Sequence, residues 1–191
     1  MKKYIYIILI VTTVVINAKI YVPDQFSVQY AGNTGFVSIG GGYNFFNKKI
    51  ATSFSYGYLP KSLGGVNIRT FSFKNSYTPW QININENYIF KPLTIGITII
   101  YTFGENFFIK RPSRYPDDYY RQTAIRLAPF VGSSFLHKTK GYTDSINFIE
   151  FYTELGTIDY YLRDYLYSAL DEQYLTLNDI VNFSFGFRIY F

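Results

Sequence analysis

The chain has 191 residues and a formal net charge of +5; 21% of its residues are aromatic, and only 16% are charged. This length favours one domain, and a mean hydropathy of zero excludes a membrane protein built from long apolar helices. The charge is too small and too dispersed to predict a nucleic-acid partner. Without cysteine, the chain has no disulfide framework and no cysteine-ligated metal site.

The first eighteen residues are predicted to be a cleaved secretory signal peptide. Met1-Lys2-Lys3 is basic, Tyr4–Ile16 is almost wholly apolar, and Ala18 supplies a small residue at the end of the segment. The apolar run is shorter than the roughly 20 residues that a transmembrane helix needs, although an uncleaved anchor is the alternative. We therefore expect a signal peptide over residues 1–18 and a single domain over residues 19–191.

Eight later segments alternate between large apolar residues and small or polar ones. Because a strand turns successive side chains to opposite faces, each segment has one apolar face and one polar face. The pattern is clearest in Val181–Phe191, where every odd position holds Val, Phe or Ile. Such alternation is typical of strands that lie between lipid and a polar interior. The expected strands are Phe26–Ala31, Val37–Phe45, Ile50–Tyr58, Ile68–Ser76, Leu93–Gly104, Thr123–Phe135, Ile149–Leu155 and Val181–Phe191.

The connections between these strands form two alternating sets. One set contains the two longest, 105–121 and 157–178, and is expected to be extracellular. Apolar residues at helical spacing predict one short helix within 157–178. The other set is expected to be periplasmic, although its segment 77–91 is long for a periplasmic turn and has no evident role. A change of parity in the alternation predicts a β-bulge near Phe148.

These patterns predict an all-β fold, an eight-stranded antiparallel transmembrane β-barrel; a soluble β-sandwich is the alternative. Side chains fill the interior of an eight-stranded barrel. Inward charges need partners there, so we expect an interior ion-pair network. Its predicted members are Arg126, Glu150, Glu154 and Arg188, joined across the lumen by Lys74. The single tryptophan, Trp80, is predicted to lie at the membrane–water interface, with an ordinary loop position as the alternative.

The signal peptide, the alternating strands and the terminal Phe191 resemble those of the small outer-membrane β-barrel proteins of Gram-negative bacteria. The segments Tyr30–Gly35 and Asn178–Gly186 are similar to uncharacterised barrels of the Bacteroidetes type. The resemblance implies that the barrel assembly machinery reads Phe187, Ile189 and Phe191 as an assembly signal. It also implies a location in the cell outer membrane, among its lipid and lipopolysaccharide.

Three functions are compatible with this sequence. The favoured one is a non-enzymatic monomeric barrel with a filled interior, which has a structural role or binds a surface partner through its long loops. The second is a lipid A-modifying hydrolase, for which the only candidates are His137 and Thr139, in a His-x-hydroxyl spacing at the periplasmic end of a strand. The third is a narrow pore. One histidine and no cysteine predict no metal site, and no cofactor is expected.

Overall fold

The computed structural model describes residues 22–104, 107–109, 123–139, 145–170 and 175–191. The predicted signal peptide lies outside these residues. The described chain is mainly strand, with three helices in the connections. The strands are β1 Gln25–Ala31, β2 Val37–Phe45, β3 Ile50–Leu59, β4 Ile68–Tyr77, β5 Ile82–Asn83, β6 Tyr88–Phe103, β7 Ile125–Lys138, β8 Phe148–Gly156 and β9 Asn182–Tyr190. The helices are α2 Lys61–Gly64, α3 Asp159–Leu170 and α4 Leu177–Ile180.

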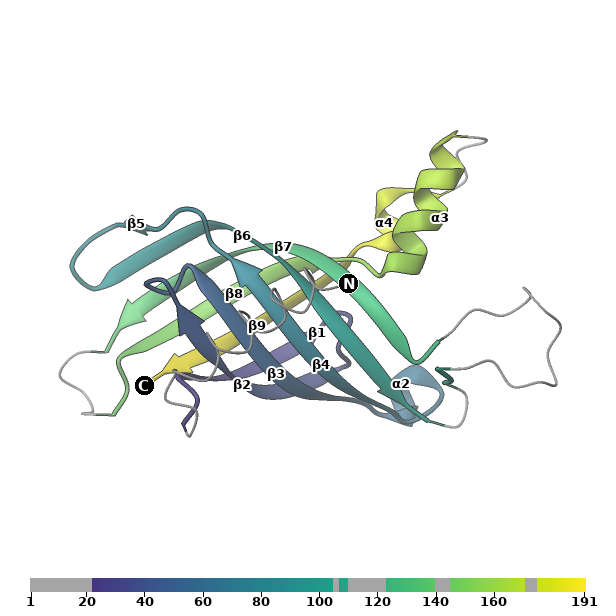
Figure 1. Cartoon of the computed structure of the whole chain (residues 1–191), viewed down its shortest axis with the longest axis horizontal. Helices are drawn as coiled ribbons and strands as arrows, with labels where there is room; N and C mark the ends of the chain where they lie inside the picture. Colours follow the sequence, from purple (N-terminus) through teal and green to yellow (C-terminus); the bar gives the residue numbers. More distant parts are fainter. Residues whose placement is uncertain (1–21, 105–106, 110–122, 140–144, 171–174) are drawn as a thin grey trace, which may run out of the picture.

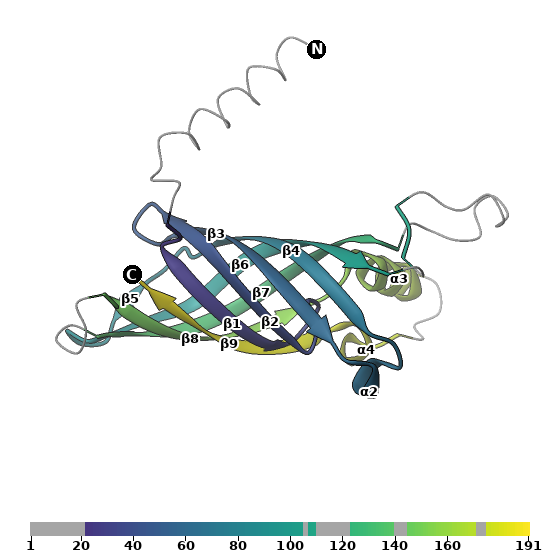
Figure 2. The same ribbon diagram turned by 90° about the horizontal axis from the view of Figure 1, so that it is seen from below.

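Eight of the strands close into an antiparallel barrel (Figure 1). Strand β1 pairs with β2 on one side and with β9 on the other, and β4 pairs with β6. The short β5 pairs with β6 and takes no part in the closure. Figure 2 shows β1 between β9 and β2, so the first and last strands of the chain are neighbours in the wall. The predicted eight-stranded antiparallel barrel is therefore confirmed, and the β-sandwich is excluded.

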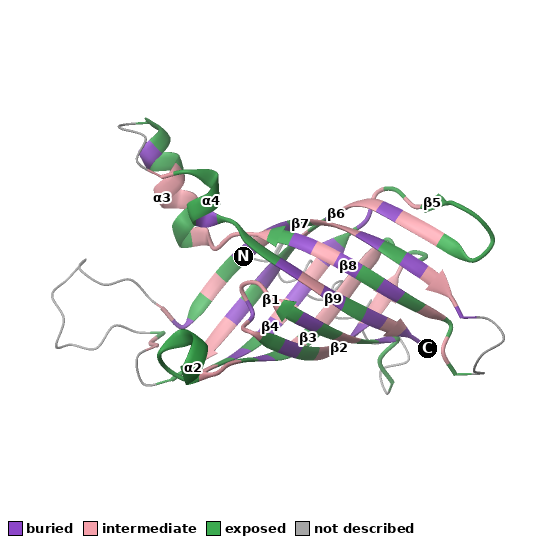
Figure 3. Cartoon of the chain, turned by 180° about the vertical axis from the view of Figure 1, so that it is seen from behind, coloured by how far each residue is buried: buried purple, intermediate pink, exposed green. Residues whose placement is uncertain are grey.

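The barrel wall has an apolar outer face and a polar inner face. Phe183 and Phe187 of β9 are 54% and 52% exposed, whereas Ser184 and Arg188, each the next residue along the strand, are buried. The other strands repeat this alternation, which Figure 3 shows as bands of buried and exposed residues along each strand. The arrangement reverses that of a water-soluble barrel, because the large apolar side chains point away from the interior.

The two ends of the barrel differ. At the end that we call the loop-rich rim lie the turn 32–36 and helices α2, α3 and α4 (Figure 1). At the opposite end, the terminal rim, lie the turn 46–49, strand β5 and Phe191. Helix α3 confirms the helix predicted within 157–178. No helix in the described part of the chain is long and apolar enough to cross a membrane.

The segment 77–91 is largely a β-ribbon that continues the wall beyond the terminal rim. Ile82 and Asn83 of β5 pair with Phe90 and Ile89 of β6, and the side chain of Asn85 accepts hydrogen bonds from two backbone N–H groups in the connecting turn. Strand β6 therefore begins at Tyr88. The predicted start at Leu93 is wrong, because the bulge described next hides the continuation of the alternation.

The predicted bulge near Phe148 is also wrong. Phe148 pairs in register with Lys138 and Tyr190, and it shares the inward parity of Glu150. The register shift lies instead in β6, between Lys91 and Thr94. Proline lacks the N–H that a strand ladder uses, so Pro92 accounts for the irregularity at this point.

Candidate functional site

Five charged side chains meet inside the barrel and form what we call the interior cluster. Strands β4, β6, β8 and β9 bring them together because all five occupy inward positions. Glu150 is fully buried, and none of the five is more than 9% exposed. The members are Lys74, Lys91, Glu150, Glu154 and Arg188.

The interior cluster is a chain of alternating charges. Arg188 lies at its centre, with one guanidinium nitrogen 3.1 Å from a Glu150 oxygen and the other 3.2 Å from a Glu154 oxygen. Lys74 Nζ lies 2.6 Å from the second oxygen of Glu154, and Lys91 Nζ lies 3.1 Å from the second oxygen of Glu150. Each buried carboxylate thus has two cationic partners, which compensates for the loss of its hydration.

Neutral side chains complete this network. Ser134 and Tyr190 donate hydrogen bonds to Glu150. Gln29 of β1 accepts hydrogen bonds from Lys74 (2.9 Å) and from the hydroxyl of Tyr152 (3.2 Å). Lys74 therefore contacts both β1 and β8 from β4, so these interactions cross the lumen. They join opposite walls of the barrel.

The structure corrects the prediction for Arg126, which lies outside the interior cluster. Its guanidinium is 3.9 Å from Asp159 and 5.5 Å from the centroid of the Tyr160 ring, at the loop-rich rim. The reason is the stagger of the strands. Glu154 pairs with Gly132, six residues along β7 from Arg126, and this separation corresponds to about 20 Å at the usual strand rise. Parity showed which face Arg126 occupies but not its height in the barrel.

Two contributors escaped the sequence analysis. Lys91 was assigned to a connection because the bulge at Pro92 masked the alternation on its far side. Tyr190 lies on the inward parity of β9 but was not recognised as a partner for Glu150. Charge balance gave no signal for Lys91, because Lys74 and Arg188 alone already match the two acids in number.

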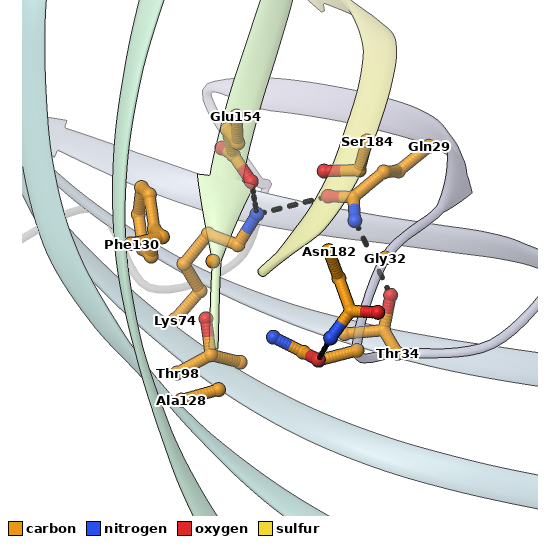
Figure 4. A pocket seen from close by; sticks show the side chains of 12 residues that line it. Gln29, Gly32, Thr34, Lys74, Thr98, Ala128, Phe130, Glu154, Asn182 and Ser184 are labelled. Atoms are coloured by element: carbon orange, nitrogen blue, oxygen red, sulfur yellow. Dashed lines mark hydrogen bonds and ion pairs between the residues drawn. The ribbon is translucent and has the colours of Figure 1, made fainter. Parts of the chain in front are cut away.

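The lumen narrows toward the interior cluster from the loop-rich rim. A vestibule of about 620 Å³ opens at that rim. Below it, a cavity of about 20 Å³ is bordered by Gln29, Lys74 and Glu154, which Figure 4 shows joined through the Lys74 ammonium group. A cavity of this size holds about one water molecule. This small cavity therefore lies between the vestibule and the interior cluster.

Lys48 lies at the other end of the lumen, in the turn at the terminal rim. Phe46, Asn47 and Lys48 all have left-handed backbone conformations, with φ of 52°, 56° and 61°, which cost about 1–2 kcal/mol for each such residue. The turn brings Lys48 Nζ to 3.2 Å from the centroid of the Phe148 ring. Burial, and then repulsion by Lys91, lower the pKa of Lys48 from its usual 10.5 to about 8.

Replacement of Lys48 by Met is expected to change how stability depends on pH. In the wild-type protein, the unfolded chain binds this proton more tightly than the folded barrel. The free energy of unfolding should therefore rise between pH 8 and about pH 10.5. Urea unfolding in detergent micelles across this range should show a smaller rise for Lys48→Met. The same replacement at the exposed Lys49 is the control, and equal slopes for all three proteins would contradict the prediction.

The two candidate catalytic residues do not form a shared site in the structure. The ring of His137 packs against Tyr88, with 4.7 Å between the ring centroids. Strand β7 ends at Lys138, so strand alternation does not extend to Thr139, and the hydroxyl of Thr139 donates a hydrogen bond to the carbonyl of Ile146. Both residues lie at the terminal rim, at the opposite end of the barrel from the long connections.

The remaining predicted residues lie on the outer surface. Trp80 is 59% exposed in the connection between β4 and β5, at the terminal rim. Phe187 and Phe191 are 52% and 53% exposed, and Ile189 lies between them on the same face. The backbone N–H of Phe191 donates to the carbonyl of Asp24, which ties the last residue to the start of the barrel.

The interior cluster is held together by ion pairs and hydrogen bonds. No group of three or more His, Asp or Glu side chains is placed to hold a metal ion among the described residues. The interior cluster holds two buried carboxylates, and both form ion pairs with lysine and arginine side chains. Comparisons with protein-family models, with curated proteins and with solved structures found no match.

Proposed function

We propose that the protein is an integral outer-membrane β-barrel with a closed lumen, which presents its loop-rich rim to the exterior and binds a partner there. The observation that carries this proposal is the inverted distribution of polarity. The interior holds paired charges, whereas phenylalanine, isoleucine, leucine, valine and tyrosine side chains are exposed around the wall. An apolar surface of this extent is unfavourable in water and favourable in lipid.

The proposed orientation follows from the two rims. Bacterial barrels have short periplasmic turns and longer extracellular loops, which supports an exterior position for the rim that carries α2, α3 and α4. Phe191 is then at the periplasmic rim, and Phe187, Ile189 and Phe191 form an outward row for the assembly machinery. The partner at the exterior is a surface molecule of the envelope, such as lipopolysaccharide, or a molecule from outside the cell.

The interior cluster favours a closed barrel over a narrow pore. An ion that crossed the lumen would have to separate Arg188 from Glu150 and Glu154, which lie 3.1 Å and 3.2 Å from it. Breaking buried pairs of this kind costs several kcal/mol. The barrel therefore acts as a rigid support for the loop-rich rim.

Planar-bilayer recording tests the closed barrel, and we expect no conductance step from the wild-type protein. The control shows that the protein has inserted into the bilayer, and it uses the fluorescence of the single tryptophan. At the membrane interface, lipids brominated near the headgroup should quench Trp80 emission more than lipids brominated at the chain end. Steps of conductance from an inserted protein would support the pore instead. No quenching by either lipid would contradict the membrane location.

A further inference from the structure

The vestibule at the loop-rich rim has the size of a small-molecule site. Its volume of about 620 Å³ lies within the range of roughly 300–1,000 Å³ that is usual for ligand pockets. Several strands contribute to it, together with the start of α3 and the turn 32–36. The interior cluster crosses the lumen below the vestibule.

The side walls of the vestibule are apolar, and its floor carries neutral polar groups. Six large apolar or aromatic side chains line it: Phe36, Leu59, Ile68, Phe107, Ile158 and Tyr161. Near the floor, an Asn182 N–H donates to the side-chain oxygen of Asn33 at 2.7 Å. The amide oxygen of Asn182 and the hydroxyl of Thr102 have no hydrogen-bond partner among the described residues. These two groups are therefore free to bond a ligand.

No charged side chain of the described residues lines the vestibule, and two described cations near it are paired. The nearest interior cation, Lys74, lies below the floor and is 2.6 Å from Glu154. Arg126 at the rim faces Asp159. A charged ligand would lose hydration on entry and gain no ionic partner from the described lining, which disfavours it.

We propose that the vestibule binds an uncharged, largely apolar small molecule that carries a hydrogen-bonding group at one end. The apolar body contacts the aromatic and aliphatic walls. The polar end reaches Thr102 and Asn182 in the lining. The inference deepens the proposed function, because it names the class of partner at the loop-rich rim, and it rests on that rim being accessible from outside.

Two fluorescent probes that differ by one charge test this selectivity. N-phenyl-1-naphthylamine is neutral, and 8-anilino-1-naphthalenesulfonate has the same rings with an added sulfonate. Both are titrated into the full barrel in lipid nanodiscs, with the signal from empty nanodiscs subtracted. We expect saturable binding of the neutral probe at one site per barrel, and binding of the anionic probe at least about tenfold weaker, a difference of about 1.4 kcal/mol.

A charge placed at the floor should reverse this preference. Thr102→Lys is expected to weaken binding of the neutral probe and to strengthen binding of the sulfonate. Asn178→Lys is the matched control, since it adds the same charge at an exposed position of α4 outside the vestibule. If Thr102→Lys does not fold, Tyr161→Ala on α3 removes part of the side wall without a change in the barrel strands, and it should weaken neutral-probe binding several-fold.

The outcomes separate this inference from the proposed function. An inserted barrel that gives no signal above empty nanodiscs overturns the vestibule as a binding site. Equal affinity for the two probes, or no response to both Thr102→Lys and Tyr161→Ala, shows adsorption elsewhere on the surface and also overturns it. Failure to insert, seen from Trp80 quenching, counts against the membrane location alone. The same titration in detergent micelles then still tests the vestibule.

Discussion

Replacement of Arg188 by Leu is expected to lower the free energy of unfolding by about 3–5 kcal/mol, the usual cost of breaking a buried ion pair. Arg188 is the only cation in the interior cluster that contacts both Glu150 and Glu154. Its guanidinium also lies 3.9 Å from the centroid of the Tyr152 ring. The variant leaves each carboxylate with one lysine and divides the network into two separate pairs. Urea unfolding of the refolded barrel in micelles measures the effect.

Arg126→Leu is the matched control for this experiment. It makes the same arginine-to-leucine change as Arg188→Leu, but at an inward position of the loop-rich rim, outside the interior cluster. The side chain of Arg126 is 21% exposed and its distance from Asp159 is 3.9 Å, so a loss of no more than about 1 kcal/mol is expected. Similar losses for the two variants would mean that the interior cluster contributes no more to stability than a rim contact does.

Gly57→Ala is expected to destabilise the barrel by about 1–3 kcal/mol, the usual cost of overpacking. A Cβ atom at Gly57 would lie 1.9 Å from the carbonyl oxygen of Thr34, which also accepts the hydroxyl hydrogen bond of Thr70. The turn 32–36 would have to move out of the mouth of the barrel. The unfolding midpoint in urea and the heat-modifiable mobility of the folded barrel report the change.

Gly41→Ala provides the comparison, because position 41 faces outward. The nearest atom to its added Cβ would be a side-chain carbon of Pro23 at 3.4 Å, an ordinary contact. Both replacements restrict the unfolded chain similarly, so the difference between them isolates the contact with Thr34. If Gly57→Ala is as stable as Gly41→Ala, the turn does not depend on the missing side chain.

Alternation in the sequence was enough to predict the eight strands of the barrel and their antiparallel order, because a strand buried on one face has a period of two. It also placed Lys74, Glu150, Glu154 and Arg188 on the inner face. Parity contains no information about height along the barrel axis, which depends on the stagger between strands. That is why Arg126 was grouped with two acids whose partners on β7 lie about 20 Å and about 33 Å from it along the strand.

The errors around β6 have a different cause. Two residues of β6, Pro92 and Leu93, occupy the register shift between Lys91 and Thr94. A single shift of this kind exchanges inward and outward positions for everything beyond it. Lys91 was therefore not predicted to face the interior, and the ribbon formed by β5 and the start of β6 was predicted to be a connection. The vestibule could not be predicted either, since its walls come from segments far apart in the chain.

The unequal length of the strands gives the barrel an oblique outline. Strand β6 has 16 residues and β1 has 7. The outer face of β6 is apolar or aromatic from Phe103 to Tyr88, and at a tilt of about 40° this corresponds to a height of about 40 Å, against the roughly 25 Å apolar band usual for such barrels. In the proposed setting, a flat bilayer cannot match both walls at once. The surrounding membrane should therefore be thicker beside β6 than beside β1, or the barrel axis should tilt relative to the bilayer normal. In either case the lipids beside the two walls would be arranged differently.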